Sequence, residues 1–390
     1  MIYLDHHATT PCDPRVVEVM LPWLTTHFGN PHSHTHAMGR QAAEACDAAI
    51  ASIASAIGGD EDALIVTSGA TESNNLAIDG VMRHPRQKRR HIITAATEHP
   101  AVLDPIARLA RDGFRVTILP VKQQGDSDCG RINLQQLSDT IDDDTALVSI
   151  MWANNEIGTI ESVREIAEIA HQAGALFHTD ATQALGRLDV NVTESDIDLL
   201  SGSAHKFYGP KGVGFLYGGS KKRRVRLRPL VEGGGQQRGL RSGTLNTAGL
   251  VGMSAAIQLC VSEMHSTENR LSKLRNDLWQ RLVAAFPNIE LNGPDLEREM
   301  RLAGNLNVSL VDVEGESIMA TARDLAISSG AACSSVDPRP SHVLTAIGLS
   351  ESRARRSLRF GLGRGTTPQQ IESAVNMLIA GHRKLIDSGG

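Results

Sequence analysis

Two segments of the chain each place one reactive side chain among small neighbours. Lys206 lies in the run SGSAHKFYGPKG (201–212), and a lysine that loses its proton in a desolvated crevice can attack an aldehyde to form a Schiff base. Cys333 lies in SSGAACSS (328–335), which has too little apolar bulk to pack as an element. An exposed thiolate there would be a nucleophile. The alternatives are a solvated surface lysine and a buried structural cysteine.

Two further segments could hold an anion and a ring. The run TSGATESNN (67–75) follows an apolar stretch, and its small and hydroxyl residues could seat a phosphate at a helix start, or simply cap the helix. It lacks the G-x-x-x-x-G-K-[ST] pattern, which disfavours a nucleoside triphosphate site. Asp180, in FHTDATQ (177–183), could keep a pyridine nitrogen protonated by ion pairing. Its alternative role is a helix N-cap.

The elements that position these residues follow from the spacing of apolar side chains. Several short runs are continuously apolar, which is typical of strands buried on both faces of a mostly parallel sheet. Amphipathic stretches separate them, such as the one from Val163 to Ala170 before Gly174. This pattern predicts an α/β fold with a large three-layer domain. The predicted strands lie at 63–67, 91–94, 115–119, 146–150, 176–179, 197–200 and 213–216.

At 390 residues the chain exceeds the size of a typical single core, so we expect two domains. After about residue 220 the alternation of short apolar runs and amphipathic stretches ends. A long amphipathic helix is predicted near 262–286. We therefore place a large domain at 13–259. A smaller α+β domain is formed by residues 1–12 and 260–390, and it includes Cys333.

Composition excludes several classes of function. The formal net charge is −5 and charged residues make up 21% of the chain, which favours neither nucleic acid nor a membrane surface as partner. We find no apolar run of membrane-spanning length and no charged leader, so we expect a cytoplasmic protein. Five scattered cysteines without a Cys-x-x-Cys pair argue against a disulfide framework.

The alternating histidines of 32–36 lie in a predicted loop, so we expect no metal there. The basic run 221–228 is interpreted as a solvated linker, with contact to an anionic partner as the alternative.

In this order the motifs resemble the cysteine desulfurases of the NifS/IscS type. These belong to the class V aminotransferases among the fold-type I enzymes that use pyridoxal 5'-phosphate (PLP). The resemblance covers nearly the whole chain and rests on YLD (3–5), ATTP (8–11), FGNP (28–31), residues 67–75, TEH (97–99), NNEIG (154–158), DATQ (180–183), HK (205–206), RSGTL (241–245), the Cys333 segment and 356–363.

The resemblance implies a role for each matching residue. Lys206 would carry PLP, Asp180 would pair with the pyridine nitrogen, and His99 would stack on the ring and move protons. Arg359 would bind the substrate carboxylate, a role that suits the fork of a guanidinium. The residues expected around the cofactor phosphate are Ala70, Thr71, Ser203 and His205, joined by Thr244 from the neighbouring subunit of a homodimer. Those expected on the O3′ side of the ring are Gln183 and Asn155, and Asn155 is also expected to contact substrate.

The implied reaction takes sulfur from L-cysteine. Lys206 removes the Cα proton, the Cys333 thiolate attacks the substrate sulfur, and the products are L-alanine and a persulfide on Cys333. The persulfide sulfur would then pass to an acceptor protein, for iron–sulfur cluster assembly or nucleic-acid thiolation. The alternatives are a selenocysteine lyase or class V aminotransferase and, from another class, a non-catalytic sulfur-relay protein.

Two positions depart from the pattern of that family. His7 stands where a small residue is usual, and Gly361 stands where serine is common. Neither carries an assigned catalytic role, so the local geometry around both is left open by the sequence.

Overall fold

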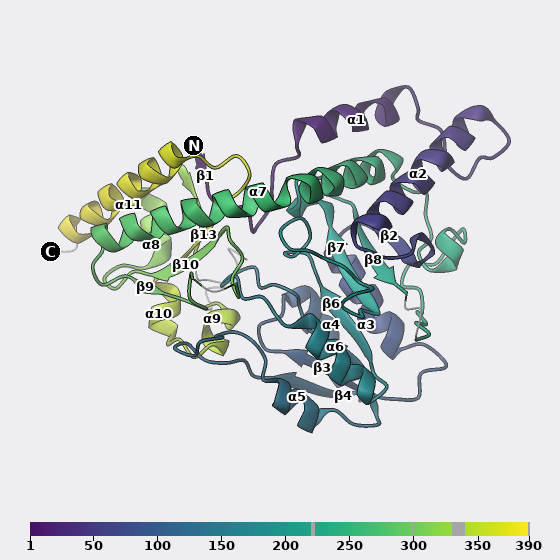
Figure 1. The fold of residues 1–390 in the computed structure, drawn as a ribbon, viewed down its shortest axis with the longest axis horizontal. Coiled ribbons are helices and arrows are strands. Elements are labelled where there is room, and N and C mark those ends of the chain that lie inside the picture. The colour runs from purple at the N-terminus through teal and green to yellow at the C-terminus, as the bar shows by residue number, and fades with distance from the viewer. Residues whose placement is uncertain (220–222, 298, 330–339, 389–390) are drawn as a thin grey trace.

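A seven-stranded sheet forms the centre of the larger part of the computed structural model, which describes residues 1–219, 223–297, 299–329 and 340–388 (Figure 1). The strand order is β2-β8-β7-β6-β5-β3-β4. Only β8 runs antiparallel to its neighbours, so the other six strands end at the same edge of the sheet. The strands are β2 (Leu64–Thr67), β3 (His91–Ala95), β4 (Arg115–Leu119), β5 (Thr145–Ser149), β6 (Leu176–Asp180), β7 (Leu199–Ser203) and β8 (Gly214–Gly218).

All seven predicted strands are present, and the α/β fold is confirmed. The predicted run 197–200 covers only the start of β7. The last three residues of β7, Ser201 to Ser203, are small and carry no apolar side chain that would reveal a strand. Consecutive strand residues enter different cores: Ile92 and Ile93 belong to two separate hydrophobic clusters, as do Leu199 and Leu200. Burial on both faces therefore explains the continuous apolar runs.

Helices cover both faces of this sheet. On one face, α3 (Ala70–Met82) and α4 (Pro100–Arg111) contribute Leu76 and Ile106 to one cluster. The other face is covered by α2 (Ala37–Ala56), α5 (Leu134–Thr140) and α6 (Val163–Gln172). The predicted end of α6 is confirmed, since Gly174 adopts a left-handed φ of 68°.

A second core brings the two ends of the chain together. Its sheet has the order β12-β13-β10-β9, and the N-terminal strand β1 pairs with β11. Ile2 and Leu4 pack in the same cluster as Leu306 and Phe360. The strands are β1 (Ile2–Tyr3), β9 (Glu290–Leu291), β10 (Asn305–Ser309), β11 (Leu325–Ala326), β12 (Ser328–Ser329) and β13 (Ser357–Gly361), and the helices here are α8 (Gly315–Thr321), α9 (His342–Ala346), α10 (Glu351–Arg355) and α11 (Pro368–Ser388).

The long helix α7 (Thr247–Ala285) connects the two cores (Figure 1). It packs against α2 and α1 (Pro14–Thr25) at one end and against α11 at the other. It begins fifteen residues before the predicted start at 262, and the predicted domain boundary at 259–260 falls inside it. Among the described residues it is also the one helix that is long and apolar enough for a membrane span, and half of its most apolar window is buried within the protein.

Candidate active site

A cavity of about 500 Å³ opens where β2, β6 and β7 end. Ligands of α/β proteins bind at this edge of the sheet because the loops that follow the strands converge there. Every predicted site residue in the described part of the chain except Thr244 lines it, namely Ala70, Thr71, His99, Asn155, Asp180, Gln183, Ser203, His205, Lys206 and Arg359. Cys333 lies outside the described residues.

Lys206 reaches the cavity from the single 3₁₀ turn that follows β7, Ala204–Lys206. Its Nζ donates to the main-chain oxygens of His7 and Ala8, both at 2.7 Å. Burial lowers the pKa of Lys206 to about 8, and the positive charges of Arg187 and Arg359 act in the same direction. A substantial fraction of the amine is therefore neutral near physiological pH, as a nucleophile or proton acceptor must be.

Asp180 is the last residue of β6 and is held rigidly. Its Oδ2 accepts from Nδ2 of Asn74 at 2.7 Å, and its Oδ1 accepts from the main-chain N–H of Thr182 at 2.9 Å. The side chain is 6% exposed, and both oxygens keep further lone pairs. A buried carboxylate fixed in this way can pair with one cationic or protonated group in the cavity.

The N-terminus of α3 faces the same cavity through Ser68, Gly69, Ala70 and Thr71. No side chain caps the helix at Gly69, so the first-turn N–H groups and the helix dipole are available to an anion. Glu72 also lines the cavity, but Arg241 pairs with its Oε1 at 2.8 Å and offsets its charge. This end of α3 suits a phosphate group.

Two histidines border the cavity as neutral side chains. His99 caps α4, where its Nδ1 accepts from the N–H of Ala101 at 3.0 Å, so its proton is on Nε2. Burial lowers the pKa of His99, and burial also lowers that of His205 to about 4. Nδ1 of His205 lies 3.0 Å from Oγ1 of Thr9. Both rings therefore offer hydrogen bonds rather than charge at neutral pH.

Gln183 is bonded at both ends of its amide. Its Nε2 donates to the main-chain oxygen of His7 at 2.9 Å, and its Oε1 accepts from Nη1 of Arg187 at 3.2 Å. Nδ1 of His7 lies 3.0 Å from the same Oε1. One N–H of the Gln183 amide remains for a ligand in the cavity.

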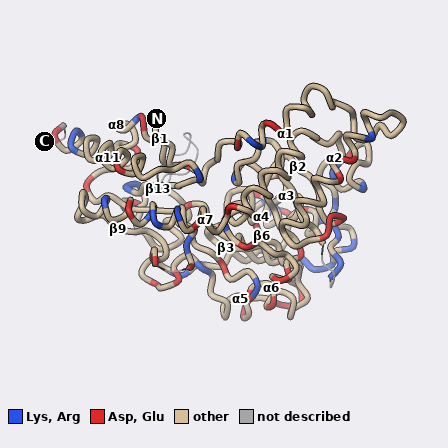
Figure 2. Tube along the Cα trace, turned by 45° about the horizontal axis from the view of Figure 1, so that its top comes forward, with Lys and Arg blue, Asp and Glu red and all other residues tan. Residues whose placement is uncertain are grey.

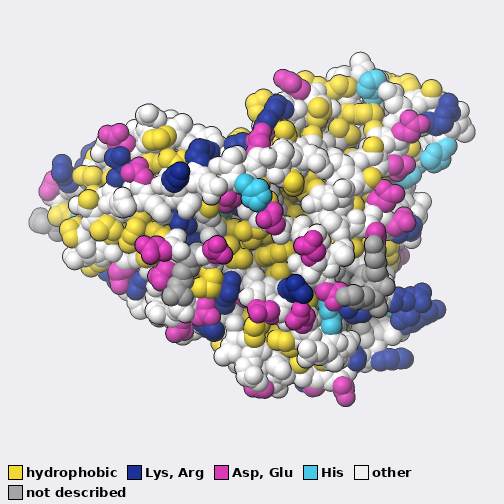
Figure 3. Space-filling model, viewed as in Figure 1, with side chains coloured by type: hydrophobic (Ala, Val, Ile, Leu, Met, Phe, Trp, Pro, Cys, Tyr) yellow, Lys and Arg dark blue, Asp and Glu magenta, His cyan; other side chains and the backbone are white. Residues whose placement is uncertain are grey.

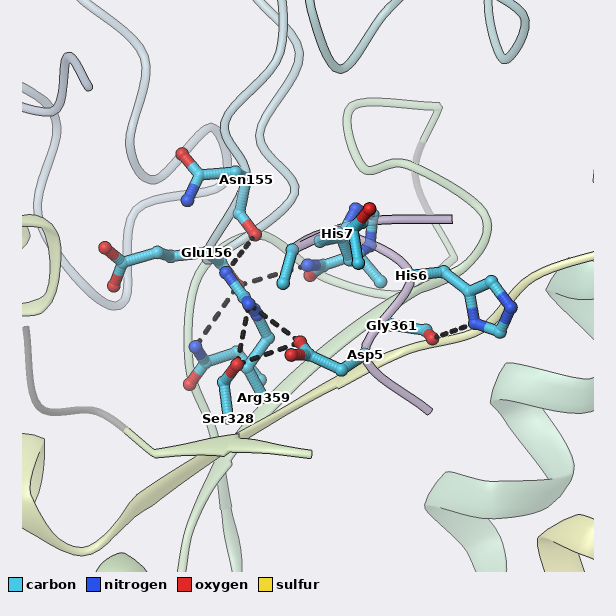
Figure 4. A network of polar contacts seen from close by, with 12 residues as sticks. Asp5, His6, His7, Asn155, Glu156, Ser328, Arg359 and Gly361 are labelled. Atoms are coloured by element: carbon cyan, nitrogen blue, oxygen red, sulfur yellow. Dashed lines mark hydrogen bonds and ion pairs between the residues drawn. The ribbon is translucent and has the colours of Figure 1, made fainter. Parts of the chain in front are cut away.

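The guanidinium of Arg359, on β13, is 3% exposed and lies in a polar network (Figure 4). Nη2 contacts Oδ1 of Asp5 at 2.8 Å and Oγ of Ser328 at 2.7 Å. Nη1 donates to the main-chain oxygen of Asn155 at 3.1 Å, and Nε has no partner among the described residues. The fork is thus fixed from three directions while a donor is left for a ligand carboxylate.

Described residues on either side of the Cys333 segment contact the surroundings of the cavity. Ser328, five residues before the cysteine, contacts Arg359 as described above. On the other side, Nε2 of His342 lies 2.8 Å from the main-chain oxygen of Glu98, the neighbour of His99.

Thr244 is exposed and does not line the cavity of its own chain. Its segment is nevertheless attached beside the cavity, since Arg241 pairs with Glu72 at the start of α3. A contribution of Thr244 to the site of a neighbouring subunit stays a prediction.

The basic run 221–228 was interpreted as a solvated linker, but its described residues, from Arg223 onward, are held against the protein. Arg223 pairs with Asp196 and Asp198 at 2.7 Å, Leu227 is buried, and the N–H of Arg228 donates to the main-chain oxygen of Gly80 at 2.9 Å. Arg224 and Arg226 line a pocket together with Arg86, which follows α3, and Lys and Arg gather at one corner of the molecule (Figures 2 and 3). Packing of Leu227 against the α3 side of the sheet explains why the run is held there.

Sequence reasoning assigned no role to Asn74, Arg187 or His7. Asn74 had a partial signal, because it lies in the helix-start motif 67–75. Its partner Asp180 is 106 residues away, and spacing along one helix cannot reveal such a pair. His7 had a different signal, since it departs from the family pattern.

Comparison with known proteins agrees with the geometry. The family model described as Aminotransferase class-V matches residues 2–373. The cysteine desulfurase IscS of Rickettsia typhi is 46% identical over 384 residues, which cover 98% of this chain and 92% of the relative. A solved NifS-like protein superimposes with a TM-score of 0.88 at 34% identity, covering 97% of this chain and 98% of its own. A structure of SspA in complex with cysteine has a TM-score of 0.79 at 35% identity, with 93% and 99% coverage.

Proposed function

The chain belongs to the aminotransferase class-V family and is a cysteine desulfurase of the IscS and NifS type, and on this premise we propose that it holds PLP on Lys206 and transfers the sulfur of L-cysteine to Cys333. The observation that carries the proposal is one cavity in which a lysine of lowered pKa, a fixed carboxylate and a buried guanidinium meet. Each of these groups has a separate task.

The residues of the cavity fit PLP. The uncapped start of α3 with Ser203 and His205 would hold its phosphate, Asp180 would hold its ring nitrogen, and Lys206 would hold its aldehyde carbon. Thr182 Oγ1 and His7 Nε2 are buried there without partners among the described residues, which is expected of groups that face a ligand. Bound here, PLP supplies an electron sink for the substrate Cα.

The chain itself binds the substrate and moves its protons. Arg359 would receive the carboxylate of L-cysteine, with the main-chain oxygen of Asn155 fixing Nη1. With a pKa of about 8, Lys206 can take the Cα proton and return it. The neutral ring of His99 carries a proton on Nε2. It would exchange a proton with the part of the substrate where the Cβ–S bond breaks.

Sulfur transfer needs no external oxidant. The Cys333 thiolate forms a bond to the substrate sulfur, the substrate Cβ–S bond breaks, and its electron pair ends as a C–H bond of L-alanine. Cys333 is left as a persulfide. The contacts of Ser328 with Arg359 and of His342 with the main-chain oxygen of Glu98, beside His99, support this role.

The experiment that tests this function removes the thiol alone. Cys333→Ala should bind PLP with an unchanged absorbance spectrum, yet form neither sulfide nor alanine from L-cysteine above background. Cys12→Ala is the matched control, because Cys12 is half-buried and outside the cavity. Unchanged sulfide release by Cys333→Ala would refute the role of this cysteine. A keto acid in place of alanine would favour the aminotransferase alternative.

The setting of the enzyme is also part of the proposal. We propose a cytoplasmic homodimer that passes sulfur to an acceptor protein, for iron–sulfur cluster assembly or nucleic-acid thiolation. With ³⁵S-labelled cysteine, the acceptor should become labelled by the wild-type protein and remain unlabelled with Cys333→Ala. Label on the same acceptor in both samples would contradict transfer through Cys333.

A further inference from the structure

His7 and Gly361, the two departures from the family pattern, contact each other in the structure. The N–H of Gly361 donates to the main-chain oxygen of Leu4 at 2.7 Å, and the N–H of His6 donates to that of Gly361 at 3.0 Å. A Cβ at Gly361 would lie 2.8 Å from the backbone nitrogen of His7 and 2.9 Å from Cδ2 of its ring. The missing side chain therefore lets the N-terminal segment approach β13 and brings His7 to the cavity.

The hydrogen bonds of Gln183 fix the tautomer of His7. The main-chain oxygen of His7 can only accept, so the Gln183 atom facing it is Nε2. The guanidinium of Arg187 can only donate, so its partner is Oε1. The His7 nitrogen that faces the same Oε1 at 3.0 Å is Nδ1, which must carry the proton. Nε2 of His7 is then a bare acceptor.

That acceptor has no partner in the described part of the protein, although His7 is only 1% exposed. His7 lines the cavity together with Lys206 and Arg359. Burial holds the pKa of His7 well below its usual value, and the charges of Arg187 and Arg359 lower it further. The imidazole thus stays neutral, and a buried acceptor of this kind requires a donor from whatever fills the cavity.

We propose that His7 is a positioning residue of the active site. Its Nδ1–H adds a bond to the amide oxygen of Gln183 and so reinforces the orientation in which an N–H, not the carbonyl, faces the cofactor. Its Nε2 accepts a hydrogen bond from an N–H or S–H group of the bound amino acid. The second role rests on the function proposed above, whereas the first concerns the protein and PLP alone.

Two amide variants separate the two nitrogens. The amide nitrogen of His7→Asn can stand near the position of Nδ1, and the amide of His7→Gln can reach that of Nε2. In titrations of the unloaded protein, PLP affinity should stay within about twofold in His7→Asn and fall about tenfold in His7→Gln and His7→Ala, the size of one hydrogen bond. The KM for L-cysteine should rise in His7→Asn and His7→Ala but not in His7→Gln. Equal PLP affinity in all three variants would overturn the positioning role, and an unchanged KM in His7→Asn would overturn the acceptor role.

Nitrogen NMR of the unloaded protein gives a readout without turnover. In protein labelled with ¹⁵N-histidine, the His7 signals, identified by their loss in His7→Asn, should show a protonated Nδ1 and a bare Nε2 at neutral pH. A proton on Nε2 would refute the proposal. Lys206→Ala separates the two hypotheses: if it binds PLP as the wild type does, the proposed cofactor site fails while the tautomer of His7 still stands.

The glycine provides a further arm of the test. Gly361→Ala should weaken PLP binding as His7→Ala does, because the N-terminal segment must move away together with the His7 and Ala8 oxygens that hold Lys206. Gly365→Ala is the control, since an added Cβ there meets nothing within 4 Å. A folded Gly361→Ala protein, by thermal melting, with wild-type PLP affinity would contradict the inferred close contact.

Discussion

Oδ1 of Asp5 lies 2.8 Å from Nη2 of Arg359, so a carboxylate at the N-terminus neutralises a guanidinium 354 residues later. Arg359 is nearly inaccessible to water, and an unpaired charge in such a place is costly. Oγ of Ser328 bonds both partners, donating to Asp5 at 2.8 Å and accepting from Arg359. The first residues of the chain are therefore part of the proposed substrate site.

Asp5→Asn tests this ion pair. The amide can still accept a hydrogen bond but leaves the guanidinium without a counter-charge. Because Asp5 is 18% exposed, we expect a loss of about 1–3 kcal/mol in the free energy of unfolding, less than for a fully buried pair. Urea denaturation measures it. Glu168→Gln, in the exposed pair with Arg164, should change stability by less than about 0.5 kcal/mol; equal effects of the two substitutions would contradict a buried, structural ion pair.

The lowered pKa of Lys206 predicts how PLP attaches. Only the neutral amine attacks the aldehyde, so the rate of attachment to the unloaded protein should rise with pH, with a midpoint near the pKa of about 8 and a plateau above it. Stopped-flow absorbance at several pH values measures this rate. Arg187→Gln removes a positive charge that lowers the pKa of Lys206, so its midpoint should move to higher pH. A wild-type midpoint near 10.5, the ordinary value for lysine, would show that burial has no such effect.

The central sheet could be predicted from sequence because most of its strands are buried on both faces. Pairs such as Ile92 and Ile93 fill two cores at once, which produces continuous apolar runs. The edge strand β4 is the exception, since only Leu119 of its residues is buried. The ends of those runs also located the cavity, since Asp180 is the last residue of β6 and Lys206 ends the 3₁₀ turn that follows β7. Such patterns involve residues that are close together along the chain, so a single sequence is enough to recognise them.

The predicted start of α7, at residue 262, was wrong for a physical reason. Residues 247–261 contain Gly249 and Gly252, which lower helix propensity. A Cβ at Gly252 would lie 2.5 Å from Sδ of Met20, so this glycine permits close packing of α7 on α1 and does not end the helix. The pairs Asn74 with Asp180 and His7 with Gln183 were also beyond prediction, because 106 and 176 residues separate their members.

Asn74→Ala tests the support of Asp180. Loss of the 2.7 Å bond leaves the carboxylate held only by the N–H of Thr182, so it should orient the cofactor ring less well. We expect kcat to fall about tenfold with little change in KM, because the carboxylate acts on the cofactor and not on the substrate carboxylate. Steady-state alanine formation measures both constants. Asn75→Ala is the control, since within the described part of the chain the side chain of Asn75 bonds only the main-chain oxygen of Thr71. A matching loss in both variants would indicate damage to α3 instead.

Thr244 offers a test of the proposed homodimer. Thr244→Asp would place a carboxylate beside the phosphate and Lys206→Ala removes the cofactor lysine, so each variant alone should be inactive. If Thr244 serves the neighbouring subunit, a heterodimer of the two variants contains one intact site, with Lys206 from one chain and Thr244 from the other. Purified through two different affinity tags, it should show about half the wild-type activity per dimer. If Thr244 acts within its own chain, each site of the heterodimer keeps one defect, and an inactive heterodimer would contradict a shared site.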